Sequence, residues 1–212
     1  MDLWAAFLQL LHGAGLHVDA GTAHRVGQAA ARMDTAHLLA LAAALGWASG
    51  FRLYAVVFLT GMAGAMGLIA LPAGLQVLQH PALLAASGAL LFVEFFADKI
   101  PGLDSVWDLA QSVIRIPAGA ALAGAVFGAD SATMAAVAAL LGGTLAASSQ
   151  AAKTTTRAAI NTSPEPFSNL LASVVEDSVV VAALWLAVSH PLLFGALLAV
   201  TVLLLALLTW WL

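Results

Sequence analysis

The sequence predicts an all-α fold, a polytopic bundle of about six transmembrane helices. Of its 212 residues, 62% are hydrophobic and 8% charged, whereas a soluble domain carries about a quarter charged residues. The mean hydropathy is +0.99. The apolar content is rich in Ala, Leu and Val, with 18 Gly. That mixture favours closely packed membrane helices over a barrel of alternating strands.

The chain divides into two expected parts. Residues 1–36 are predicted to form an amphipathic appendage at the membrane interface, because Leu3, Phe7, Leu10 and Leu11 recur at helical spacing. Residues 37–212 are predicted to form the transmembrane helical domain. The chain has no cysteine, which excludes disulfides and thiolate metal sites.

Six segments approach the length of about 20 apolar residues that a span needs. Pro81 and Pro191 stand where a first helical turn tolerates proline, and Asp130 or Ser131 can cap the helix that follows. The apolar stretch 38–49 is short, and we interpret it as a re-entrant or interfacial piece. The predicted spans are 51–71, 81–97, 113–128, 131–152, 170–188 and 191–212.

Basic residues suggest an orientation for these spans. With six spans and a cytoplasmic N-terminus, all seven Lys and Arg residues fall at the cytoplasmic side, and the outside loops carry none. This distribution agrees with the positive-inside rule. Both termini are therefore predicted to be cytoplasmic.

Ionisable residues near membrane depth indicate a functional site, because each costs about 2.5–3.5 kcal/mol when central. They fall on four helix faces at spacings of three, four or seven residues, and all four faces end at the same membrane side. The faces are Glu94 and Asp98; Asp104, Asp108, Gln111 and Arg115; Ser149, Lys153 and Arg157; and Asn169, Ser173, Glu176 and Asp177.

These faces predict one binding site for an ion or other small substrate. Its residues are Glu94, Asp98, Lys99, Asp104, Asp108, Arg115, Lys153, Arg157, Asn161, Asn169, Ser173, Glu176 and Asp177. With Glu165, seven acids face four bases, so a cationic ligand is favoured, either protons or a metal ion. The candidate metal ligands are Glu94, Asp98, Glu176 and Asp177, and a divalent cation is the only candidate cofactor. Structural ion pairing is the competing interpretation for the bases.

Three motifs resemble a known family. They are SGFRLY at 49–54, EFFADKIPGLDSVWD at 94–108 and KTTTRAAINTSPEPFSNLLASVVEDS, which begins at Lys153. Together they resemble the bacterial membrane family called domain of unknown function 4126, over residues 38–212. The resemblance implies a multi-span protein of the bacterial inner membrane and no established chemistry.

Three functions remain open from the sequence. The first is a transporter or channel for a small solute, with a cation favoured, built around helix breaks at 46–50 and 161–166, with inverted repeats left open. The second is a membrane enzyme in which Asp98, Asp104 and Asp108 hold Mg²⁺ while Lys153 and Arg157 bind a lipid or prenyl phosphate. The third is a non-catalytic scaffold. Expected partners are membrane lipid and the small solute; the net charge of −4 argues against nucleic acid, and a homo-oligomer is left open.

Overall fold

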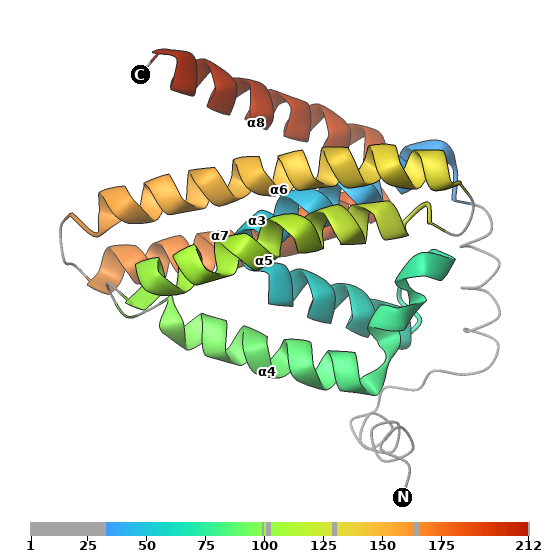
Figure 1. Cartoon of the computed structure of the whole chain (residues 1–212), viewed down its shortest axis with the longest axis horizontal. Helices are drawn as coiled ribbons and strands as arrows, with labels where there is room; N and C mark the ends of the chain where they lie inside the picture. The colour runs from blue at the N-terminus through green and yellow to red at the C-terminus, as the bar shows by residue number, and fades with distance from the viewer. Residues whose placement is uncertain (1–32, 99, 101–102, 129–130, 163–165, 212) are drawn as a thin grey trace, which may run out of the picture.

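A computed structural model describes residues 33–98, 100, 103–128, 131–162 and 166–211, and every regular element within these ranges is a helix (Figure 1). The predicted all-α class is confirmed. The elements are α3 (Thr35–Ala65), the 3₁₀-helix η1 (Ala73–Gln79), α4 (Pro81–Ala97), α5 (Leu103–Ala125), α6 (Ala132–Ile160), α7 (Pro166–Ser189) and α8 (Pro191–Trp211). The predicted appendage, residues 1–36, lies almost wholly outside the described residues.

Several helices have the length and composition to cross a membrane. Within the described residues these are α3, α6 and α7, and η1 with α4 would add a fourth although the pair is bent by 68°. Helix α8 is apolar and somewhat shorter. These helices mark the chain as a membrane protein. The count of six spans and their orientation stay predictions.

The central helix, α3, breaks at Arg52. Its backbone angles there are φ −147° and ψ 77°, outside the helical region. In the first half of α3 (residues 35–51), Gly46 lies against Gly142 and Gly50 lies against Ser149. The first half therefore runs in the same direction as α6.

The second half of α3 (residues 53–65) runs the other way. Gly88 of α4 lies against Phe58, and Leu84, one turn earlier in α4, lies against Gly61, so this half is antiparallel to α4. Because α4 and α6 both run toward the same end of the bundle (Figure 1), the two halves are antiparallel. α3 is thus a helical hairpin with both ends at one end of the bundle and Arg52 at its tip.

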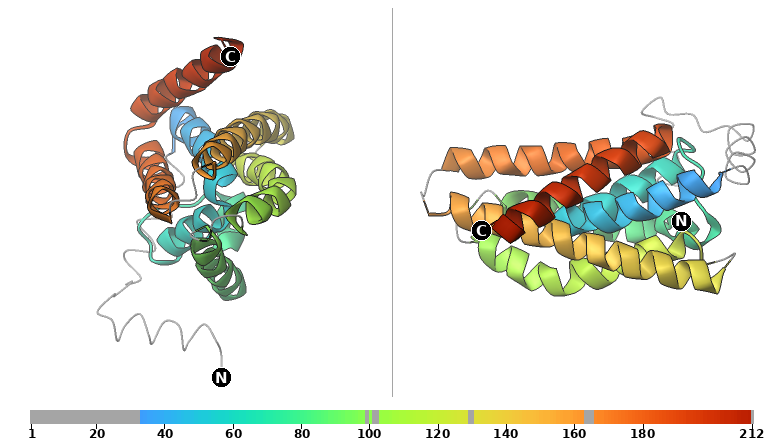
Figure 2. Two further views of the ribbon diagram at one scale, coloured as in Figure 1. Left: turned by 90° about the vertical axis from the view of Figure 1, so that its left-hand side faces the viewer. Right: turned by 90° about the horizontal axis from the view of Figure 1, so that it is seen from above.

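This hairpin corrects the first predicted span. Residues 38–49 are not an interfacial piece: they belong to the first half of α3, which the other helices surround (Figure 2). Because the chain turns back at Arg52, the hairpin is compatible with the predicted re-entrant piece. The predicted span 51–71 is wrong at both ends, because the helix extends from Thr35 to Ala65. The described chain begins and ends toward opposite ends of the bundle (Figures 1 and 2).

The later predicted spans coincide with helices, and two of them were too short. α4 matches its predicted bounds, and Ser131 caps α6 by accepting a hydrogen bond from the Met134 amide at 3.2 Å. Helix α5 begins ten residues earlier than predicted, and α6 continues to Ile160. Both extensions carry charged residues, which a hydropathy criterion excludes although the fold buries several of them.

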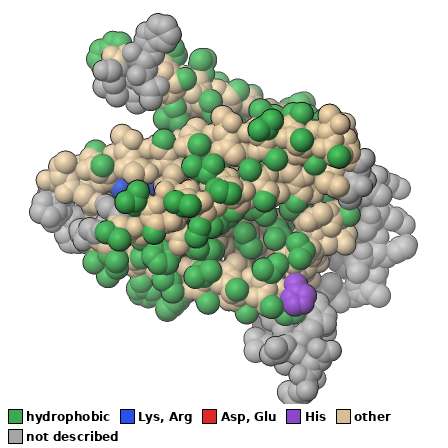
Figure 3. All heavy atoms as spheres, in the orientation of Figure 1, with side chains coloured by type: hydrophobic (Ala, Val, Ile, Leu, Met, Phe, Trp, Pro, Cys, Tyr) green, Lys and Arg blue, Asp and Glu red, His purple; other side chains and the backbone are tan. Residues whose placement is uncertain are grey.

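The exterior of the bundle is largely apolar. In Figure 3 hydrophobic side chains spread over the visible helices, basic atoms show only in a small area, and no acidic side chain is visible. Charged side chains are instead buried, among them Arg52, Glu94, Asp98 and Arg115 at 0% exposure. The fold therefore gathers its charges inside a shell suited to lipid.

Candidate functional site

The break in α3 arises where the chain must pass very close to α6. A Cβ atom on Gly50 would lie 2.0 Å from Ser149 Oγ and 2.2 Å from the Ala146 carbonyl oxygen. Only glycine allows this approach. Two residues later, Arg52 leaves the helix and carries its guanidinium into the centre of the bundle, where it is fully buried.

Arg52 links the tip of the hairpin to α4 and α7. Its Nη1 atom lies 2.5 Å from Asp98 Oδ2, and its Nε atom lies 3.0 Å from Asp177 Oδ1. Nη2 donates a 2.7 Å hydrogen bond to Ser173 Oγ. The planar guanidinium thus holds three elements at fixed relative positions.

Arg115 forms a second centre on α5. It pairs with Glu94 of α4, and its Nη1 atom lies 2.8 Å from Asp108 Oδ1. The same Nη1 atom donates to Gln150 Oε1 of α6 at 3.0 Å. Buried charges of this kind require such partners.

Lys153 connects the two centres. Its Nζ atom lies 3.0 Å from Asp108 Oδ1, 3.4 Å from Glu176 Oε2 and 3.6 Å from Asp98 Oδ2. It also donates to the Phe51 carbonyl oxygen at 3.1 Å. Phe51 is the last residue before the break, where helix carbonyls need an outside donor and a cation is favoured.

Arg157 closes the network toward the end of the bundle. Its Nε and Nη2 atoms contact the two carboxylate oxygens of Glu176, each at 3.0 Å, the bidentate geometry of a strong ion pair. Its Nη1 atom donates to the Asn169 side chain and to the backbone carbonyl of Asp98, both at 3.2 Å. Asn169 in turn donates to Asn161 at 2.8 Å.

We call these charged residues the ionic network. Its described members are five acids and four bases: Glu94, Asp98, Asp108, Glu176, Asp177, Arg52, Arg115, Lys153 and Arg157. If all are ionised, one negative charge is in excess. Asp177 has a side chain 35% exposed, whereas the others are at most 9% exposed. The network is therefore a buried, nearly balanced cluster with one accessible carboxylate.

Some carboxylate oxygens of the network have no partner. Among the described residues, Glu94 Oε2, Asp98 Oδ1 and Asp108 Oδ2 are buried without a hydrogen bond. Each belongs to a carboxylate whose other oxygen contacts a base. A proton added at one of these oxygens would make that carboxyl group neutral, while its other oxygen could still accept a hydrogen bond from the base.

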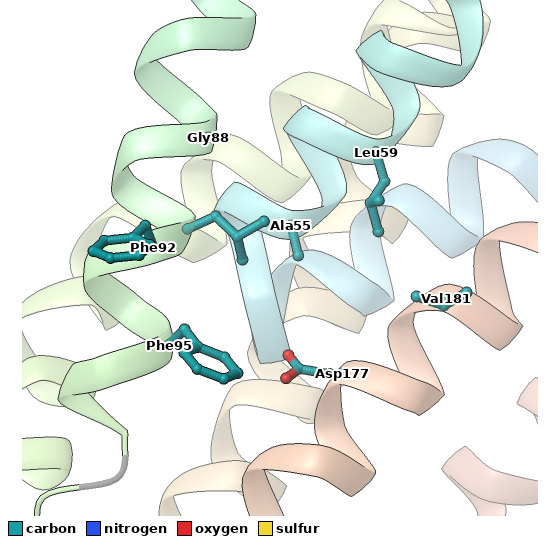
Figure 4. Close-up of a pocket in the computed structure, with 8 residues that line it drawn as sticks. Ala55, Leu59, Gly88, Phe92, Phe95, Asp177 and Val181 are labelled. Atoms are coloured by element: carbon teal, nitrogen blue, oxygen red, sulfur yellow. The ribbon is translucent and has the colours of Figure 1, made fainter. Parts of the chain in front are cut away.

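A pocket of about 390 Å³ reaches the network at Asp177 (Figure 4). It lies between α4 and α7, over the second half of α3, and the Asp177 carboxylate points toward it. Phe92 and Phe95 line the α4 side, and Val181 lines the α7 side. The accessible carboxylate thus faces an otherwise apolar space.

One family model matches the chain, that of the "Domain of unknown function (DUF4126)", over residues 39–211. This chain belongs to that family. The comparisons with curated proteins and with solved structures each found no match. Membership in DUF4126 agrees with the resemblance predicted from the three motifs, all of which supply members of the network, for example Arg52, Asp98 and Lys153.

The structure of this DUF4126 protein brings most of the predicted site residues together. Lys99 lies outside the described residues, and the Asp104 side chain is not described. The predicted residues that meet in or beside the network are Glu94, Asp98, Asp108, Arg115, Lys153, Arg157, Asn161, Asn169, Ser173, Glu176 and Asp177.

The four predicted metal ligands contact basic side chains in the described part of the chain. No group of three or more acids or histidines suited to a metal ion occurs there. Glu94 pairs with Arg115, while Asp98, Glu176 and Asp177 all contact Arg52. Cationic side chains occupy the positions that a divalent ion would need.

The basic residues bear on the orientation argument and on the phosphate hypothesis, both of which stay predictions. Arg52, Arg115, Lys153 and Arg157 lie inside the bundle in ion pairs, so their positions have an explanation other than the positive-inside rule. Lys153 and Arg157 contact carboxylates, whereas the enzyme hypothesis assigned both to a phosphate.

The sequence reasoning missed Arg52, Gln150 and Tyr54 as site residues. Tyr54 donates to Gln111 at 2.9 Å, and Gln150 accepts from Arg115. Arg52 had a signal in the sequence, since it is the only charged residue between 38 and 93 and follows Gly50 by two positions. A charge so isolated in an apolar stretch indicates a functional or paired residue.

Proposed function

We propose that this protein is a membrane transporter that exchanges a monovalent cation for a proton at the ionic network. The main support for this proposal is the charge count of the described network, which has five carboxylates and four cationic side chains. Its one accessible carboxylate faces a pocket. A single positive charge neutralises the described network. Both a proton and a cation can supply that charge.

Competition for one charge would couple the two ions. An excess charge near membrane depth costs about 2.5–3.5 kcal/mol on insertion scales, so the empty network is disfavoured. Occupancy by both ions would leave an excess positive charge and is disfavoured for the same reason. The transporter would therefore release the proton when it takes up the cation, and the exchange would be electroneutral.

Named atoms support each half of this exchange. Glu94 Oε2 is a candidate proton position, because it is buried and unpartnered while Glu94 Oε1 pairs with Arg115. Asp177 is the candidate cation ligand, because it is the accessible member. A divalent metal ion is a poorer substrate here, since the described part of the chain holds no suitable ligand group.

The broken hairpin supports transport over a purely structural role. Transporters commonly place their sites at discontinuous helices, where freed backbone groups and helix ends meet the substrate. Here the break at Arg52 lies at the network, with the Phe51 carbonyl bound by Lys153. We propose that the end of the bundle where α4 and α6 terminate faces the cytosol of a bacterial inner membrane.

Liposomes containing the purified protein and a trapped pH-sensitive dye test this function. A cation gradient should move protons in the opposite direction for at least one member of a panel of Na⁺, K⁺, ammonium and organic monocations. Asp177→Asn should abolish the exchange, because it removes the excess charge, and should lower the melting temperature only slightly, because Asp177 is partly exposed and Arg52 keeps its pair with Asp98. Val175→Ala, a change at an exposed position of α7 that does not line the pocket at Asp177, is the control and should exchange normally.

Two results would contradict the proposal. One is that no cation of the panel moves protons through the unmodified protein. The other is that Asp177→Asn lowers stability as much as it lowers flux, which is the behaviour of a structural scaffold.

A further inference from the structure

Three adjoining pockets form a lateral groove along α7. Their volumes are about 390, 590 and 480 Å³, within the size range of small-molecule sites. Val181 lines all three, Asp177 lines the first two, and Trp185 lines the last two. The lateral groove therefore extends from Asp177 toward Ser189, the end of α7.

The walls of the lateral groove are mostly apolar, with one charged side chain, Asp177, and the hydroxyl groups of Ser178, Thr60 and Ser189. The second half of α3 contributes Leu59, and α4 contributes Phe92 and Phe95. Asp177 supplies the carboxylate at one end. Such a groove suits a molecule with an apolar body and a single polar group.

The depth of Asp177 decides what kind of cation can reach it by this route. Asp177 is the twelfth of the 24 residues of α7, hence near the middle of the helix. The groove opens between α4 and α7 (Figure 4), on a bundle whose exterior is apolar. A hydrated inorganic ion cannot approach through hydrocarbon at this depth, whereas an organic cation with an apolar surface can.

We infer that the substrate is a lipophilic organic monocation that enters the lateral groove from the bilayer and places its charge beside Asp177. This inference rests on the proposed function, since it names the class of cation that neutralises the network. Charge complementarity favours a cation over a lipid acyl chain, because an acyl chain would contact the walls and has no charge to interact with the Asp177 carboxylate. Aromatic faces near the carboxylate, from Phe92 and Phe95, add attraction for a soft cation.

Binding of tetraphenylphosphonium to the full chain in lipid nanodiscs tests this inference. Tetraphenylborate, of similar size and opposite charge, is the matched probe. The phosphonium ion should bind and the borate ion should not compete with it. Asp177→Asn should abolish phosphonium binding, because the compensating carboxylate is lost.

Two valine variants on α7 distinguish binding in the lateral groove from nonspecific binding to the lipid-facing surface. Val181→Trp fills the groove and should weaken phosphonium binding by about tenfold or more. Val175→Trp is the control: Val175 is 52% exposed against 53% for Val181, and does not line these pockets. It should bind like the unmodified protein.

Several outcomes would overturn the inference. Equal affinity for the two probes would identify a lipid-tail site. A dimer that Val181→Trp dissociates would identify an interface between two copies. If small inorganic cations exchange for protons through Asp177 while the phosphonium ion neither binds nor moves, this inference fails and the proposed function stands. If no cation of either class moves protons, the proposed function fails as well.

Discussion

The two halves of α3 have similar composition and different surroundings. The first half packs against α5, α6, α7 and α8, with an unbroken buried run from Ala44 to Gly50, and only Leu41 of this half lines the lateral groove. The second half packs on α4 and η1, and its other side lines the lateral groove. The comparison indicates that the first half holds α3 in place, and that the second half, joined to it at Arg52, is the one that can contact a substrate.

Removing the Arg52 guanidinium, which lies between the two halves, should have the largest effect on stability. Arg52→Met leaves Asp98 and Asp177 without their guanidinium, and breaking a buried ion pair in this way costs about 3–5 kcal/mol. Thermal unfolding of the detergent-solubilised protein should show a large drop in melting temperature. Arg52→Lys keeps the charge but loses the planar fork, so its drop should be smaller. A melting temperature unchanged in Arg52→Met would refute the role of the network in joining the halves.

Glycine substitutions in the two halves should differ in their effect on stability, and this difference should be smaller than the loss caused by Arg52→Met. A Cβ on Gly50, in the first half, meets the backbone oxygen of Ala146 at 2.2 Å, which cannot move aside. A Cβ on Gly64, in the second half, meets the end of the Leu71 side chain at 2.5 Å, which can. Gly50→Ala should therefore destabilise the protein by about 1–3 kcal/mol.

For Gly64→Ala we expect little net change, since alanine also favours the helix by about 1 kcal/mol. Both variants are measured by the same thermal unfolding experiment. Equal losses of stability in the two would show that the halves are packed with similar rigidity.

The smallest expected effect concerns the start of the first half. The His37 backbone amide donates to Asp34 Oδ1 at 2.9 Å, and this bond, with a side-chain bond from His37, lowers the pKa of Asp34 below its usual value. A carboxyl whose pKa is lower in the folded state stabilises the fold above its unfolded pKa of about 3.9. That contribution is lost as the pH falls through the lowered folded value.

Amide NMR of ¹⁵N-histidine-labelled protein can follow this cap. The His37 amide shift should titrate with a midpoint below that of a free aspartate. Asp34→Asn, which keeps a capping oxygen without the charge, should remove the acidic titration. A midpoint at or above 3.9 would show that the cap does not favour the ionised form.

Sequence periodicity located the site residues better than the path of the chain. Glu94 with Asp98, and Lys153 with Arg157, each share a helix face at a spacing of four, and the structure brings both faces into one network. The ion-pair partners of these residues could not be predicted, because spacing shows which residues share a helix face and does not show which faces meet. Arg52 was assigned to a helix end for that reason, since its carboxylates lie 46 to 125 positions away in the sequence.

Composition and local pattern by themselves determined the helical membrane class, the family resemblance and most helix positions, because hydropathy and proline placement act over a few residues at a time. Only the tertiary structure decided that α3 turns back at Arg52, that the bases neutralise the acids and that a groove leads to Asp177. The reason is physical. A single non-helical residue reverses the chain, and the partners of its side chain are on helices distant in the sequence.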